Sequence, residues 1–99
     1  MEYWYDSRHT GALRVIDHRR GRLFGGDSSE VFWTASVRRV DDKTIEVDFV
    51  DKRTHHGRRI MHAVYKDRRN RLHWPDGNVW RRLRVDPRTL IEHLPSDKT

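Results

Sequence analysis

The segment that most constrains the fold runs from Arg71 to Trp80 and has the pattern of a tight β-hairpin. Two short runs of strand-forming residues flank a turn made of Pro75, Asp76, Gly77 and Asn78. Proline presets φ at the first turn position, aspartate bonds to its own backbone, and glycine or asparagine tolerates a positive φ. A hairpin specified in this way indicates an antiparallel sheet and places the chain in the all-β class.

Short segments of alternating apolar and polar residues follow one another along the chain, as in an antiparallel meander. The clearest covers residues 31–38, where apolar Trp33 alternates with polar Thr34. We predict a small curled meander or barrel of about six strands, with a flexible loop at residues 25–29 and a short C-terminal helical turn at residues 89–94. The expected strands cover residues 3–5, 12–18, 31–38, 45–49, 60–66, 72–74 and 79–85.

A chain of 99 residues is long enough for one domain with one modest core. We assign residues 1–95 to this β-domain and residues 96–99 to a disordered tail. Hydrophobic residues make up 34% of the chain and charged residues 36%, so the core is lean in aliphatic side chains. Aromatic residues, which bury a large area each, are therefore expected to supply much of it.

The chain contains no cysteine, which excludes disulfides and cysteine-based zinc sites. Its first residues show no charged segment followed by an apolar run, so we identify no secretory signal. No stretch reaches the roughly 18 apolar residues of a transmembrane helix. We therefore expect an intracellular protein of the cytoplasm or nucleus, without a membrane partner.

The charge balance points to a polyanionic partner. Twenty-one Lys and Arg residues oppose 15 Asp and Glu residues, giving a net charge of +6. The planar guanidinium group of arginine pairs with phosphate in a bidentate fork, and nucleic acid is the most common partner of such a surface. We predict a nucleic-acid-binding surface made of Arg19, Arg20, Arg22, Arg68, Arg69, Arg71, Trp74, Arg81 and Arg82.

The sequence alone does not show whether the basic clusters lie close together in the folded protein. Alternate turns of a meander lie at one end of the sheet, so residues 19–22 and 68–71 either converge on one rim or lie at opposite ends. Convergence would create a phosphate-binding rim. In the alternative interpretation the arginines pair singly with nearby acids and serve only solubility.

The aromatic residues allow two interpretations as well. In the first, they form a platform on which bases stack, with Trp4, Tyr5, Trp74 and Trp80 as candidates. In the second, which the small number of Leu and Ile residues favours, they form the core. Trp74 and Trp80 flank the hairpin turn and are the first candidates for exposure, whereas Trp33 lies on the clearest apolar face and is expected to be structural.

Neither a metal site nor an active site is expected. His55 and His56 are adjacent, and His62 and His73 fall on neighbouring predicted strands, but there is no His-Glu-x-x-His spacing. There is also no nucleophile elbow and no phosphate-cradling glycine motif. We predict a non-enzymatic protein without a cofactor.

The hairpin carries a resemblance to a known kind of domain. Trp74, Asp76, Gly77 and Trp80 are similar to a Trp-x-Asp-Gly-x-x-Trp signature of small β-domains in predicted proteins of unicellular algae and other protists. Those domains open with a strand like residues 4–7, Trp-Tyr-Asp-Ser. The resemblance implies the β fold and brings no activity with it.

A second resemblance covers about 20 residues. Residues 32–40 and 45–51 resemble the core hairpin of Tudor and Agenet domains, in which an aromatic residue precedes an Ala-x-Val strand and the next strand ends near Phe-x-Asp. This resemblance implies an aromatic cage that binds methylated lysine or arginine through cation–π attraction.

The sequence therefore favours a binding module whose arginine and aromatic side chains engage RNA or single-stranded nucleic acid. No helix suited to a major groove is apparent in it. The alternative is a protein–protein interaction or oligomerisation module, including a Tudor-like reader, because tryptophan and arginine are enriched at interface hot spots. The oligomeric state is left open.

Overall fold

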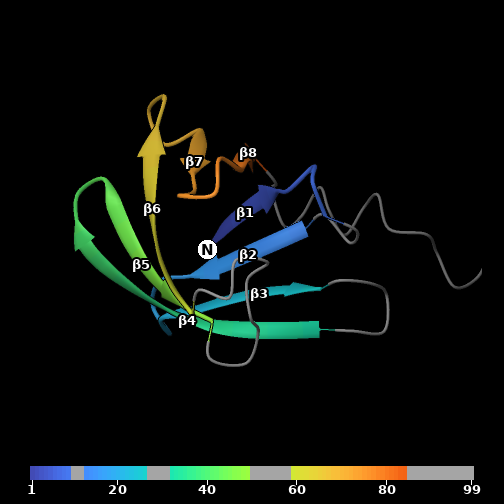
Figure 1. Cartoon of the computed structure of the whole chain (residues 1–99), viewed down its shortest axis with the longest axis vertical. Coiled ribbons are helices and arrows are strands. Elements are labelled where there is room, and N and C mark those ends of the chain that lie inside the picture. The colour runs from blue at the N-terminus through green and yellow to red at the C-terminus, as the bar shows by residue number, and fades with distance from the viewer. Residues whose placement is uncertain (10–12, 27–31, 50–58, 85–99) are drawn as a thin grey trace, which may run out of the picture.

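A closed antiparallel β-barrel forms the protein in the computed structural model, which describes residues 1–9, 13–26, 32–49 and 59–84 (Figure 1). These residues contain strands and turns and no helix. Each strand pairs with the next along the chain, and the last pairs with the first, which confirms the all-β class. The strands are β1 (Glu2–Tyr5), β2 (Leu13–Asp17), β3 (Arg22–Gly26), β4 (Phe32–Asp41), β5 (Thr44–Asp48), β6 (Ile60–Lys66), β7 (Arg71–His73) and β8 (Val79–Leu83).

The structure has eight strands, whereas the sequence predicts about six and outlines seven ranges for them. The element that the sequence prediction lacks is β3, because Gly25 and Gly26 suggest a loop and glycine usually weakens a strand. Both glycines pair with β4, and Gly25 lies opposite Trp33. A Cβ atom at Gly25 would lie 2.4 Å from a ring carbon of Trp33, so this strand needs a glycine to make room for the indole.

Strand β4 is the longest strand and pairs with a different neighbour along each half of its length. Its first half, from Phe32 to Ser36, pairs with β3, and its second half pairs with β5. The register shifts between Arg39 and Asp41, which marks a bulge or irregularity near the strand end. Figure 1 shows the change of strand direction around the barrel, since β2 and β3 run roughly horizontally whereas β5 runs obliquely and β6 nearly vertically.

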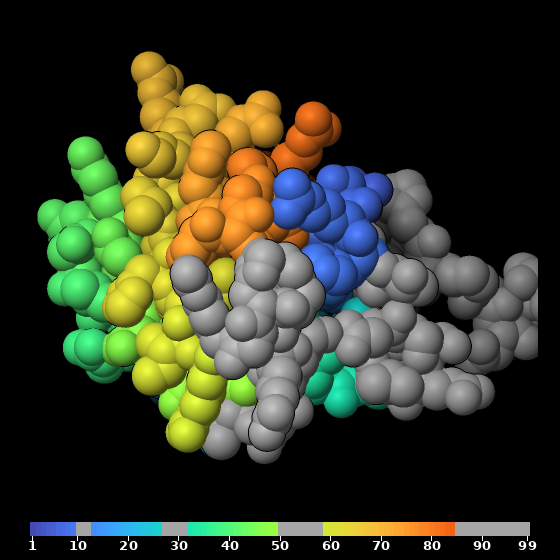
Figure 2. All heavy atoms as spheres, viewed as in Figure 1, coloured from blue at the N-terminus to red at the C-terminus, as the bar shows by residue number. Residues whose placement is uncertain are grey.

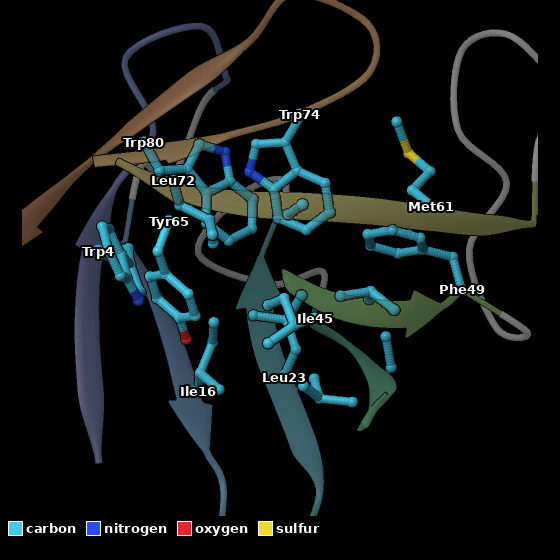
Figure 3. Close-up of a cluster of buried hydrophobic side chains, with 14 residues drawn as sticks. Trp4, Ile16, Leu23, Ile45, Phe49, Met61, Tyr65, Leu72, Trp74 and Trp80 are labelled. Carbon is cyan, nitrogen blue, oxygen red and sulfur yellow. The ribbon is translucent and has the colours of Figure 1, made fainter. Parts of the chain in front are cut away.

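The interior follows the alternation expected from the sequence. Alternate residues of every strand point inward, and Trp33 packs against them, as predicted for a structural residue. The buried residues of the core are Trp4, Ile16, Leu23, Ala35, Val37, Ile45, Val47, Phe49, Met61, Ala63, Tyr65, Leu72, Trp74 and Trp80 (Figure 3).

Trp74 and Trp80 lie in the core, as the core interpretation predicts, so the assignment of Trp74 to a binding surface is wrong. Their relative exposure is 7% and 4%, and their ring centroids lie 4.5 Å apart inside the barrel. Figure 3 shows the two indoles side by side near Leu72, which faces Trp80 across β7 and β8. The physical reason is the lean core, because a barrel with few aliphatic side chains fills its interior with aromatic area.

Several expectations fall on residues outside the described ranges. These are the helical turn at residues 89–94, the tail at residues 96–99 and the paired histidines at positions 55 and 56. Within the described ranges, no helix has the length and apolarity needed to cross a membrane.

We expect Gly25→Ala to destabilise the barrel by about 1–3 kcal/mol, because the new methyl group would overlap the Trp33 ring. Urea unfolding measures the change in unfolding free energy. In a Trp33→Leu background the same substitution should cost much less, since the obstructing ring is gone. An equal cost in both backgrounds would show that the ring does not set the requirement for glycine.

Candidate functional site

One end of the barrel gathers the basic turns. Because every strand pairs antiparallel with its neighbours in chain order, the turns at residues 18–21, 42–43 and 67–70 all lie at the same end. We call these three turns and the strand residues that flank them the basic end. The clusters at residues 19–22 and 68–71, whose relative position the sequence left open, therefore lie at one end of the molecule.

A buried polar cluster connects the turn at residues 18–21 to β6 across this end. Nε2 of His18 lies 2.8 Å from Oε2 of Glu2 and 3.0 Å from the hydroxyl oxygen of Tyr65. The Tyr65 hydroxyl donates a hydrogen bond of 2.8 Å to Oε1 of Glu2, and Nε1 of Trp4 donates another of 3.1 Å to the same oxygen. The carboxylate of Glu2 thus holds together groups from two strands and one turn.

The environment of this cluster sets its protonation. Burial by itself would raise the pKa of Glu2, but hydrogen bonds from His18, Tyr65 and Trp4 and the charge of His18 outweigh it and lower the pKa to about 2. Burial and the neighbouring Glu2 carboxylate raise the pKa of Tyr65. The pair is therefore a carboxylate and a neutral phenol at neutral pH.

Two predicted binding residues are built into this end. The Arg82 guanidinium lies 5.3 Å from the Trp4 ring, and its Nη1 is 3.8 Å from Oε2 of Glu2, with the side chain only 18% exposed. Arg69 lies 5.3 Å from the Tyr65 ring and donates a hydrogen bond of 2.9 Å to the backbone oxygen of Asp42. Arg82 is therefore largely a structural group, whereas Arg69 is exposed but held in place.

The other predicted arginines are exposed and weakly held or free. Arg20, itself 75% exposed, lies 3.7 Å from the buried Asp17. Arg71 lies 3.8 Å from Asp67 in an exposed pair of the kind that contributes little to stability. The side chains of the remaining ones have no hydrogen-bond or ion-pair partner within the described part of the chain. These are Arg19, Arg22, Arg68 and Arg81.

The alternative interpretation, in which arginines pair singly with acids, holds elsewhere. Arg38 is hydrogen-bonded to Glu46, and Nε of Arg59 lies 2.8 Å from Oδ1 of Asp48. The contrast separates these neutralised arginines, on β4 and just before β6, from the free arginines of the basic end.

The turn at residues 67–70 has an unusual backbone. Asp67, Arg68 and Arg69 have φ values of 52°, 54° and 66°, all in the left-handed region that suits glycine. The Asn70 amide closes the turn by donating a hydrogen bond of 2.9 Å to the Asp67 carbonyl oxygen. Left-handed conformations cost side-chain-bearing residues roughly 1–2 kcal/mol each, so this turn holds its arginines at the expense of stability.

A groove of about 460 Å³ runs between this turn and the turn at residues 42–43. Figure 2 shows the two turns as projecting tips, green for β4–β5 and gold for β6–β7, with a notch between them. Its lining carries four basic and two acidic side chains, so the groove is positively charged. The lining residues are Asp42, Lys43, Val64, Tyr65, Lys66, Asp67, Arg68 and Arg69.

The opposite end contains a buried ion pair that sequence reasoning missed. Arg14 is 1% exposed, and its guanidinium lies 3.3 Å from Asp6 and 5.2 Å from the Trp33 ring. Burial would raise the pKa of Asp6, but hydrogen bonds from Asn78 and His9 and the charge of His9 lower it. The sequence contained part of the information needed to predict this pair, because Arg14 and Ile16 are two residues apart and so lie on the same face of β2. Alternation alone does not show which face of a strand points into the barrel, however, so the burial of Arg14 follows only from the strand pairing.

The exposed aromatic residues match those expected only in part. Of the platform candidates, Trp4 and Trp74 lie in the core, whereas Tyr5 is 42% exposed. The other exposed rings belong to Phe24 and Phe32, at 42% and 76%. Among the described residues, no group of three or more His, Asp or Glu side chains is placed to hold a metal ion.

No family model matches this chain, and neither the curated proteins nor the solved structures contain a significant match to it. The two sequence resemblances therefore stay predictions.

We expect Arg68→Gly to be more stable than Arg68→Ala by about 1 kcal/mol in urea unfolding, because only glycine adopts the left-handed backbone freely. At Arg38, in a regular strand, the order should reverse, with alanine more stable than glycine. The same order at both positions would contradict the left-handed assignment.

The lowered pKa of Glu2 predicts an acid-sensitive fold. Because the folded state holds the carboxylate more strongly than the unfolded chain, this contribution is complete above pH 4.5 and disappears as the pH falls toward 2. Wild-type protein should lose on the order of 1–3 kcal/mol of unfolding free energy over that range through this group. Glu2→Gln should flatten the dependence measured by urea unfolding at each pH, and an unchanged dependence in this variant would contradict the assignment to Glu2.

Proposed function

We propose that this protein is a non-enzymatic module whose basic end binds nucleic acid, as RNA or another single strand. The observation that carries the proposal is the placement of residues 19–22 and 68–71 at the same end of the barrel, where Arg19, Arg22 and Arg68 have no side-chain partner among the described residues. Unpaired guanidinium groups at one end supply a concentrated positive field and phosphate ligands.

The physical basis of binding is phosphate neutralisation. Each phosphate contacted by Lys or Arg releases condensed counterions, which makes affinity strongly dependent on salt. The described part of the chain is all strand and turn, so it offers no helix for the major groove of a duplex. Recognition led by the backbone, with bases contacted where they are unpaired, suits such a surface.

The left-handed turn supports the same conclusion. Glycine at positions 68 and 69 would relieve the backbone, yet both positions carry arginine. Unfavourable backbone conformations of this kind concentrate at functional sites, where the surrounding structure holds them. Arg68 lines the basic groove, which gives its charge a place to act.

A protein-interaction or oligomerisation module is the second candidate. Phe32, at 76% exposure, is the observation that favours it, because a large exposed apolar side chain is typical of a contact surface. A Tudor-like reader is a special case that includes the same residue. A molecular mass that rises with concentration, or binding of methylated peptides at Phe32, would support this candidate instead.

We expect Arg68→Glu to weaken binding to a short labelled RNA and to reduce the slope of log affinity against log salt by about 0.7 for each phosphate that the variant no longer neutralises. Fluorescence anisotropy at several salt concentrations measures both quantities. Arg59→Glu is the matched control, because it makes the same charge change at a pair with Asp48 outside the basic end. Equal effects of the two variants would show that binding depends on the total charge of the protein and not on the basic end. If wild-type protein does not bind RNA even at low salt, the proposal is refuted.

A further inference from the structure

The outer face of the barrel carries a continuous row of basic and apolar side chains next to the basic end. The registers place Lys66 opposite Arg71, Arg71 opposite Arg81, Arg81 opposite Tyr5, and Tyr5 opposite Leu13. All five side chains are exposed, while the residues beside them in each strand point inward. Neighbouring strands are about 4.8 Å apart, so the row crosses five strands without interruption.

A second row of outward-facing side chains lies two residues further along β1 and β2, about 7 Å from the first row. It runs from Tyr3 on β1 through Val15 on β2 to Phe24 on β3, each opposite the next. Tyr5 and Phe24 are both 42% exposed, and Leu13 is 50% exposed. Cross-strand contacts between these side chains stabilise the sheet, but they leave much of Tyr5 and Phe24 open to solvent.

We propose that this surface is where the bases of a single-stranded nucleic acid stack, and we call it the stacking face, defined by Lys66, Arg71, Arg81, Tyr5 and Phe24. Lys66, Arg71 and Arg81 would contact successive phosphates, and the rings of Tyr5 and Phe24 would stack on unpaired bases. The inference rests on the proposed function and adds to it the part of the surface that reads bases.

Continuity with the basic end favours this occupant. Lys66 and Arg71 flank the turn at residues 67–70, so one strand can pass from the basic groove onto the stacking face without crossing an uncharged surface. Figure 2 shows the orange surface of β7 and β8 adjoining the blue surface of β1. A groove that tracks the phosphates beside rings that stack on bases is the usual arrangement for binding single strands.

The charge pattern of the row favours nucleic acid over a protein partner. Lys66, Arg71 and Arg81 are three consecutive cations with no acid between them in the row, and such a run suits the regularly spaced phosphates of a nucleic-acid strand. Duplex nucleic acid fits no better, because paired bases present no free ring face to Tyr5 or Phe24.

The first test uses the unmodified protein. We would measure, by fluorescence anisotropy, its affinity for a short single-stranded RNA, for the same strand annealed to its complement, and for a strand of equal charge with abasic sites. We expect the normal single strand to bind about 5- to 100-fold more tightly than the abasic strand, and the duplex to bind less tightly than the single strand. Equal affinities for the normal and abasic strands would overturn the stacking face.

The second test locates the face. Tyr5→Ala and Phe24→Ala should each weaken single-strand binding by about 5- to 100-fold without changing the salt slope, while Arg81→Glu should lower the slope. Val40→Ala, a change at another exposed apolar side chain, is the control, and Tyr5→Trp should retain binding because it keeps a stacking ring. Circular dichroism confirms that each variant is folded.

The outcomes separate this inference from the proposed function. If Arg68→Glu weakens binding but the folded Tyr5 and Phe24 variants bind like wild type, the basic end stands and the stacking face is refuted. If wild type binds no strand at low salt, both are refuted. If Phe24→Ala abolishes a concentration-dependent rise in molecular mass instead, this face is a self-association surface and the inference is wrong.

Discussion

The pairing of β1 with β8 is the contact on which the rest of the molecule depends. It joins the first and last strands of the described chain through the pairs Tyr3–Leu83, Trp4–Arg82 and Tyr5–Arg81. Closure removes the unpaired edges of an open meander and encloses one interior. The same pairing brings Arg82 over Trp4 inside the barrel and Arg81 beside Tyr5 outside it, so it shapes both the basic end and the proposed stacking face.

Closure also leaves two open ends, and buried polar groups fill both. Glu2 with His18 and Tyr65 occupies one end, and Asp6 with Arg14 occupies the other. In each case an acid is satisfied by several donors, as burial of a charge requires. Removing one partner of such a pair is strongly destabilising because it leaves a buried charge uncompensated, which makes these acids points of vulnerability in the fold.

The barrel divides its charges according to what they do. Arg14 and Arg82 are buried or nearly so and hold the ends together, and Arg38 and Arg59 are matched to acids on the outer surface. Three of the four predicted arginines without a described partner lie at or beside the basic turns, and one of them, Arg68, has a backbone conformation that opposes stability. A fold that needed charge only for solubility would gain nothing from that placement, which is why the basic end is the best candidate for function.

The sequence by itself determined the all-β class, the hairpin at residues 71–80, the structural role of Trp33 and the excess of arginine, because these depend on local turn chemistry, period-two alternation and composition. Tertiary structure decided the rest. Alternation shows which residues share a face of a strand, but both faces of a barrel strand have the same period, so it could not place Trp74 and Trp80 in the core or Arg14 inside. Nor could it detect β3, whose Gly25 is explained only by the Trp33 ring on the next strand. Which turns share an end, and that Arg81 lies beside Tyr5, follow from strand pairing between residues far apart in sequence, which local physics does not specify.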